Sequence, residues 1–148
     1  MRKTFTLTAI LLLTGILPGM ASGHFTTKIK LPSGQTVVVA EGEFEARSIG
    51  SFSVRLYQAA SGGNETTFFT SGLIHSRDGV VEKVVLEDIN DDEQPEIIVI
   101  VRSVGTGNYL SAHAFSIDKY QQLISGPIVE SLQAETDPVV ALRESASR

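Results

Sequence analysis

The sequence has no cysteine among its 148 residues and only 3 histidines. Without cysteine the chain can form no disulfide, no Cys-based zinc site, no thiol nucleophile and no lipid-modified cysteine anchor. Basic residues are also in the minority, with 12 Lys and Arg against 17 Asp and Glu. This balance argues against a nucleic-acid-binding protein, because such a protein neutralises phosphates with basic side chains.

No apolar run is long enough for a membrane-spanning helix. The stretch at residues 7–17 is shorter than the roughly twenty residues that a bilayer core requires. A basic start, Met1–Lys3, precedes it, and small residues, Ala21–Gly23, follow it. This arrangement predicts a secretory signal peptide over residues 1–23, with cleavage after Gly23 or, as the second choice, two residues earlier. It predicts a periplasmic or secreted protein without a membrane anchor.

The remaining chain, residues 24–148, has the length of one domain. Removal of Arg2 and Lys3 changes the net charge from −5 to −7. A chain of this size buries roughly two-thirds of its unfolded surface, which is enough for one hydrophobic core. Since it lacks cysteine, the domain must depend on that core for its stability.

Strand patterns dominate this domain. Residues 51–57 alternate strictly between apolar and polar side chains, which predicts a half-buried strand. Residues 97–101 are β-branched without interruption, which predicts a central strand covered on both faces. Asp78-Gly79 occupies a hairpin position and predicts a tight turn over residues 77–79. The expected strands are 25–31, 37–39, 51–57, 67–76, 80–86, 97–101, 109–117 and 121–129.

These strands and their spacing predict an all-β fold, an antiparallel β-sandwich of about eight strands. The last two strands are expected to be joined at Asp118-Lys119. A short helix is expected around residues 139–144, after Pro138. Neither internal repeats nor alternating strands and helices are present.

The histidines give little sign of catalysis. His24 stands at the predicted new N-terminus, and His75 and His113 lie in strand patterns without a second ligand nearby. A zinc site needs three or four converging ligands, so we interpret all three as ordinary residues of a sheet. An exported hydrolase that uses His75 or His113 stays open as an alternative, although the Gly-x-Ser-x-Gly signature of a nucleophile elbow is missing.

An acidic segment, residues 88–96, offers a second alternative. Asp88, Asn90 and Asp92 stand at positions 1, 3 and 5 of a calcium loop, and Glu96 at position 9. The sixth and twelfth positions do not carry the expected Gly and Glu. Two interpretations follow: a calcium-dependent binding or adhesion module, and, more favoured, an acidic turn with side-chain bonds to its own backbone.

The segment Ser103–Tyr109 directly follows the most apolar strand. Gly105 and Gly107 bend the chain, and Thr106 and Tyr109 present a hydroxyl and an aromatic group three residues apart. No Lys-Ser/Thr and no helix follow, so a phosphate cradle is disfavoured. Between two strands, such a loop would be a stiff protrusion, which suits binding because little entropy is lost on docking.

Residues 86–118, which contain both segments, resemble the bacterial periplasmic inhibitors of i-type (invertebrate-type) lysozyme, the PliI family. In these inhibitors a loop reads Ser-Gly-x-Tyr. Here Thr106-Gly107-Asn108-Tyr109 occupies it, with Thr in place of Ser. The resemblance implies a β-sandwich, often a homodimer, that blocks the lysozyme active site, performs no chemistry and needs no cofactor. It also implies that the protein protects the bacterial wall from a host enzyme.

The resemblance assigns roles to the four loop residues. Thr106 would hydrogen-bond to the two carboxyl groups of the lysozyme cleft, and Gly107 would let the loop tip enter without a clash. Asn108 would contact the rim, and Tyr109 would pack where a sugar ring stacks. The partner that the resemblance implies is an i-type lysozyme, and the net charge of −7 would speed the encounter with a basic enzyme.

Overall fold

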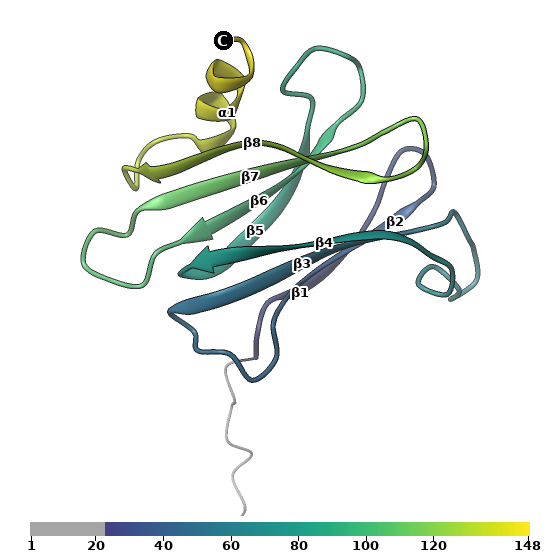
Figure 1. Cartoon of the computed structure of the whole chain (residues 1–148), viewed down its shortest axis with the longest axis horizontal. Helices are drawn as coiled ribbons and strands as arrows, with labels where there is room; N and C mark the ends of the chain where they lie inside the picture. The colour runs from purple at the N-terminus through teal and green to yellow at the C-terminus, as the bar shows by residue number, and fades with distance from the viewer. Residues whose placement is uncertain (1–22) are drawn as a thin grey trace, which may run out of the picture.

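The structure, a computed structural model, describes residues 23–148 as two four-stranded sheets that pack face to face (Figure 1). The first sheet contains β1 (Thr26–Lys30), β2 (Thr36–Glu41), β3 (Ile49–Tyr57) and β4 (Phe69–Asp78), in that order. The second contains β5 (Val80–Glu87), β6 (Glu96–Arg102), β7 (Leu110–Ile117) and β8 (Leu123–Leu132), in that order. All neighbouring strands are antiparallel, which confirms the predicted sandwich.

The predicted signal peptide lies outside the described residues, except for Gly23. Among residues 23–148, no helix is long and apolar enough to cross a membrane.

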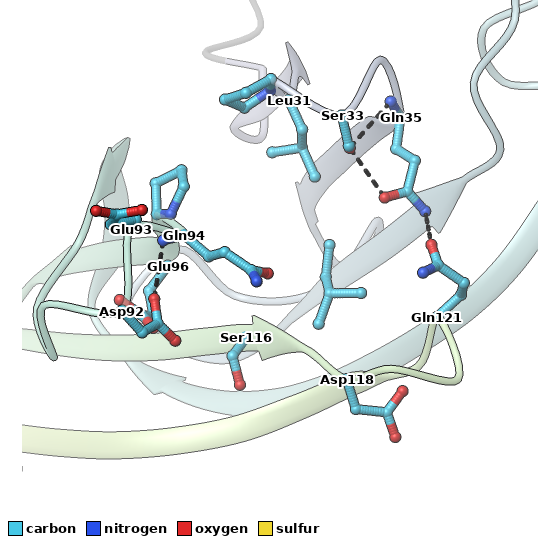
Figure 2. A pocket seen from close by; sticks show the side chains of 13 residues that line it. Leu31, Ser33, Gln35, Asp92, Glu93, Gln94, Glu96, Ser116, Asp118 and Gln121 are labelled. Atoms are coloured by element: carbon cyan, nitrogen blue, oxygen red, sulfur yellow. Dashed lines mark hydrogen bonds between the residues drawn. The ribbon is translucent and has the colours of Figure 1, made fainter.

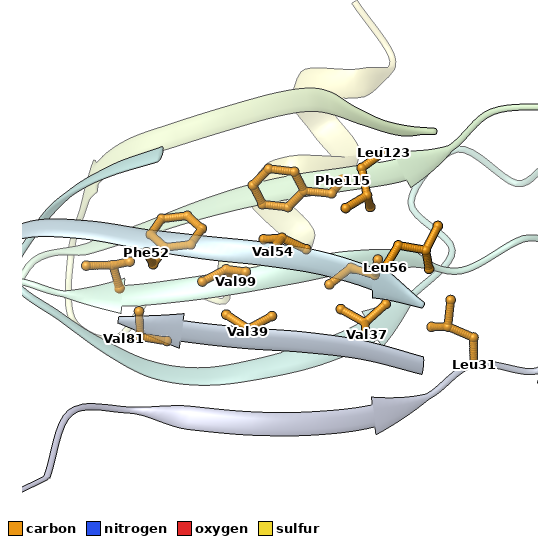
Figure 3. Packing of buried hydrophobic residues seen from close by; sticks show 12 residues of the cluster. Leu31, Val37, Val39, Phe52, Val54, Leu56, Val81, Val99, Phe115 and Leu123 are labelled. Atoms are coloured by element: carbon orange, nitrogen blue, oxygen red, sulfur yellow. The ribbon is translucent and has the colours of Figure 1, made fainter. Parts of the chain in front are cut away.

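A hydrophobic core fills the space between the sheets (Figure 3). Phe52, Val54 and Leu56 alternate along β3 and are completely buried, as the alternating pattern predicts. They face side chains of the opposite sheet, among them Val99 and Phe115. Each fully buried side chain of this size contributes about 1.5–3 kcal/mol, so the core can stabilise the sandwich without disulfides.

Strand β6 is covered on both faces, which confirms the prediction from its uninterrupted β-branched run. Alternate residues face the core, and Ile98 and Ile100 face the other way, toward a second cluster. That cluster includes Leu142 of α1 (Pro138–Ala146), the helix predicted near the C-terminus. Asp137 caps this helix, because its carboxylate accepts a hydrogen bond from Val139 N at 2.9 Å. The helix therefore shields the outer face of the second sheet (Figure 1).

The predicted hairpin at residues 77–79 is wrong. β4 pairs with β3 and β5 pairs with β6, so the chain passes from one sheet to the other at this point. The whole connection is Gly79, whose φ of +124° favours glycine. A side chain there would collide with the carbonyl group of Arg102. Arg77, expected in the turn, is instead a buried residue of β4.

The connections gather at the two ends of the sandwich (Figure 1). We call the end that holds residues 42–48, Gly79 and residues 103–109 the Gly79 end. The opposite end holds the connections 31–35, 58–68, 88–95 and 118–122.

Candidate binding loop

The loop between β6 and β7 has an exposed tip and a fixed base. The backbone N–H of Ser103 donates to the carbonyl oxygen of Tyr109 at 2.9 Å and closes the loop. Thr106, Gly107 and Asn108 are exposed, and Tyr109 is 46% exposed. Tyr109 lies one residue before β7, not within the strand as predicted. The structure thus places all four predicted site residues together on one protruding loop, whose stems are the two central strands of their sheet.

A side-chain pair braces the base of this loop. The Arg102 guanidinium binds the Glu82 carboxylate through two nitrogens, and the bond from Nη2 to Oε1 measures 3.0 Å. The remaining nitrogen, Nη1, donates to the carbonyl oxygen of Asn108 at 3.2 Å. Glu82 stands at an irregularity in the pairing of β5 with β6, where such a bulge can redirect a side chain. The hydrogen bond to Glu82 raises the pKa of Arg102.

The tip has its own internal packing. The Tyr109 ring lies so close to Gly107 that a Cβ atom on this glycine would overlap the ring. Asn108 adopts a left-handed backbone conformation, with φ of +46°, which asparagine tolerates better than most residues. Gly107 therefore has a role inside the loop, since it makes room for the Tyr109 ring.

The acidic segment 88–96 forms a turn that satisfies its own backbone. Asp88 accepts hydrogen bonds from the backbone N–H groups of Asn90, Asp92 and Glu93, at 3.3, 3.2 and 2.8 Å. Glu96 is buried and accepts from the Asn90 side chain at 2.8 Å and from the backbone N–H of Ile89 at 3.0 Å. Among residues 23–148, no group of three or more acidic or histidine side chains could hold a metal ion. The arrangement therefore favours the acidic turn over the calcium site.

The pKa values of this turn reflect the same bonds. Desolvation works against the charged form of Asp88, but the backbone N–H groups of Glu93, Asn90 and Asp92 outweigh it and lower the pKa. Burial raises the pKa of Glu96. The turn borders a pocket of about 320 Å³ at the opposite end of the sandwich. Figure 2 shows Asp92, Glu93 and Glu96 on one side of it and Gln35, bonded to Gln121 at 2.7 Å, on the other.

Two of the three histidines meet between the sheets. The rings of His75 and His113 lie 5.7 Å apart and pack with Phe52 and Phe115. His75 Nε2 is 3.3 Å from the Ser125 hydroxyl. In the described part of the chain, however, no carboxylate contacts His75, so the orienting acid of a hydrolase triad is missing. The sequence-based interpretation as ordinary sheet residues therefore fits His75 and His113.

Burial lowers the pKa of His75 and lowers that of His113 from 6.5 to about 4, the latter also through the neighbouring His75. In the folded protein, His113 therefore stays neutral at pH values below 6.5, at which the same side chain in the unfolded chain already binds a proton. We expect the free energy of unfolding to decrease between pH 6.5 and pH 4, by up to about 3 kcal/mol from His113 alone. The raised pKa of Glu96 acts in the opposite direction.

Urea unfolding at a series of pH values, with wild type and His113→Phe side by side, isolates this contribution. The phenylalanine variant should lose less stability on acidification than wild type. Parallel profiles for wild type and His113→Phe would contradict the assignment.

Fold and loop together define the class of this protein. A sandwich that presents exposed hydroxyl and aromatic groups on a braced loop is suited to binding another macromolecule. The family model of the periplasmic lysozyme inhibitor of I-type lysozyme, PliI, matches residues 23–146. The chain belongs to this family. It is an inhibitor protein rather than an enzyme, and the family name places it in the periplasm, as predicted.

Two solved structures are similar to this chain. One is the periplasmic lysozyme inhibitor of I-type lysozyme from Aeromonas hydrophila, with 43% sequence identity and a TM-score of 0.76 over 80% of this chain and 98% of that one. The other is the A. hydrophila PliI in complex with Meretrix lusoria lysozyme, with 43% identity and a TM-score of 0.74 over 80% of this chain and 95% of that one. None of the curated proteins matches the chain.

Proposed function

We propose that this protein inhibits i-type lysozyme by inserting the loop Thr106–Tyr109 into the active-site cleft. The observation that carries the proposal is a loop with an exposed tip and a braced base. Because Arg102 and Glu82 already fix the base, little conformational freedom is lost on docking. Complex formation between the A. hydrophila relative and a lysozyme supports the choice of partner.

The loop chemistry suits a lysozyme cleft, which holds one protonated and one ionised carboxyl group. The Thr106 hydroxyl can accept a hydrogen bond from the first and donate one to the second. The ring of Tyr109 packs where a sugar ring would stack, and its hydroxyl binds a polar wall. Asn108 contacts the rim of the cleft. Inhibition is therefore competitive with peptidoglycan and requires neither a covalent step nor a cofactor.

The test mixes the purified protein with one lysozyme each of the i, c and g types and measures lysis of bacterial walls. We expect inhibition of the i-type enzyme, relieved by excess substrate. Amide hydrogen exchange of that complex should slow at residues 103–109. Undiminished lysis by the i-type enzyme would contradict the function, and inhibition without protection of the loop would contradict the mechanism.

Four further predictions belong to this proposal. Residues 1–23 direct export and are removed, which mass spectrometry of the periplasmic protein would check.

The net charge of −7 on the mature chain speeds association with a basic lysozyme, so the association rate should fall as salt is added. Pairing of two copies and protection against a host enzyme also stay predictions.

A further inference from the structure

The loop at residues 42–48 carries an exposed aromatic side chain in an unfavourable backbone conformation. Phe44 is 101% exposed and has φ of +64°, in the left-handed region that phenylalanine avoids. Neither feature helps the fold, because the ring contributes nothing to the core and the backbone is strained. Strain of this kind persists where the surroundings impose it, and it is a reason to look for a function.

The contacts of the neighbouring residues hold the backbone around Phe44 in this conformation. On the C-terminal side of Phe44, the buried Arg77 guanidinium donates to the carbonyl oxygens of Ala46 and Arg47, both at 2.9 Å. The Glu45 carboxylate accepts from the backbone N–H of Ser51 at 2.6 Å and from its hydroxyl at 2.7 Å. The ring of Phe44 thus projects from a base that is already fixed, as an anchor residue of a binding surface does.

This loop shares the Gly79 end with the loop 103–109 (Figure 1). The backbone N–H of Gly79 donates to the carbonyl oxygen of Ser48 at 2.8 Å, and the other side of Gly79 packs against Arg102 and Ser103. A hollow of about 410 Å³ lies at the same end, lined mainly by residues of β4, β7 and β8. Its lining also includes Tyr109 of the loop 103–109 and Ile49, which is 63% exposed and directly follows the loop 42–48. The hollow therefore connects the loop 103–109 with the start of β3, where the loop 42–48 ends.

A protein bound to the loop 103–109 must also contact residues outside this loop, because a stable interface is larger than the loop. A stable protein–protein interface covers about 800 Å² on each partner and involves some 20–30 residues, far more than four loop residues supply. At this end of the sandwich, Glu43 of the loop 42–48 and Asp78, which lines the hollow, are exposed and take part in no ion pair within residues 23–148. These two carboxylates suit a basic surface on the partner.

We infer that Phe44 is a second anchor for the lysozyme, seated in an apolar recess with a basic border beside the active-site cleft. This inference rests on the proposed function, because the loop 103–109 brings the enzyme to the Gly79 end. Phe44 adds affinity outside the cleft and selects among enzymes by the shape of their surface next to it, whereas Thr106 and Tyr109 address the catalytic groups.

The experiment measures the inhibition constant of the full mature protein against an i-type lysozyme. Phe44→Ala should raise it about tenfold or more, as truncation of an interface anchor does. Phe44→Gly should raise it at least as much while the melting temperature stays equal or rises, because glycine relieves the strained φ. A loss of affinity in a variant that is no less stable cannot result from unfolding. Phe68→Ala is the matched control, since Phe68 is 57% exposed at the opposite end, and should change the constant less than twofold.

Every other outcome contradicts either the second anchor or the proposed function. If Phe44→Ala inhibits like wild type while truncation of Thr106 and Tyr109 abolishes inhibition, the second anchor is refuted and the proposed function stands. If the wild-type protein itself does not inhibit, the proposed function fails. If sedimentation shows that Phe44→Ala separates paired copies and leaves the inhibition constant unchanged, Phe44 contacts a second copy of this chain and the inference is likewise overturned.

Discussion

Replacing Thr106 and Tyr109 together by alanine should weaken inhibition of i-type lysozyme by about 2–4 kcal/mol, which is about a 30- to 700-fold rise in the inhibition constant. In the proposed complex, the double variant removes the hydroxyl that would face the two carboxyl groups of the enzyme. It also removes the ring that would fill a sugar subsite. Both groups would lie at the centre of the interface, where truncation has its largest effect.

The fold should survive this change, because Thr106 and Tyr109 are exposed and the loop keeps its closing bond at Ser103. The measurement is a lysis assay over a range of inhibitor concentrations, together with a thermal melt. Thr66→Ala combined with Tyr120→Ala is the matched control, since these residues of the same two types are exposed at the opposite end. Equal potency of the two double variants would refute the assignment of the loop.

The parts of the fold that could be predicted from sequence are those recorded in local patterns. The alternation of β3 follows from one buried and one open face, and Phe52, Val54 and Leu56 bear it out. The uninterrupted apolar run of β6 follows from burial on both faces, between the core and α1. In both cases the pattern of a few consecutive residues reports the surroundings of the strand.

The hairpin at residues 77–79 was predicted wrongly because the deciding contacts are not local. Asp-Gly has the same local chemistry in a hairpin as in a step between sheets. Arg77 finds its acceptors at Ala46 and Arg47, about thirty positions away in the chain. The residues next to Arg77 in the sequence indicate neither the burial of its side chain nor the change of sheet at Gly79.

The candidate site divides in the same way. Thr106–Tyr109 could be located through a resemblance and through glycines that mark a loop. The role of Glu82 at the base of the loop could not be predicted. Glu82 lies twenty positions before Arg102 in the sequence, and an irregularity in β5 sets the direction of its side chain. The spacing of Asp88, Asn90 and Asp92 suits both a calcium loop and an acidic turn, and the residues at the sixth and twelfth positions favour the turn. The backbone N–H groups that bind Asp88 add a reason that the sequence does not contain.

Arg77→Met should lower the free energy of unfolding by about 3–5 kcal/mol, because it removes one partner from a buried charge network. The Arg77 side chain is fully buried, and Nε lies 3.0 Å from the carbonyl oxygen of Ser51 and 3.9 Å from the carboxylate of Glu41, which is also buried. Without the guanidinium, the Glu41 carboxylate loses its buried cationic neighbour, and the carbonyl groups of residues 46, 47 and 51 lose the hydrogen bonds from Arg77. Arg77→Lys should recover part of the loss, since it keeps the charge but lacks the planar fork of donors.

Urea unfolding at neutral pH measures the effect, and Arg143→Met is the matched control. Arg143 is 51% exposed and lies 3.4 Å from Glu87 on the surface, so its removal should change stability by less than about 1 kcal/mol. Hydrogen exchange at Gly79, whose N–H binds the carbonyl oxygen of Ser48, should accelerate in Arg77→Met and not in Arg143→Met. If the two variants are equally stable, the loop 42–48 is held by its own backbone and not by the buried arginine.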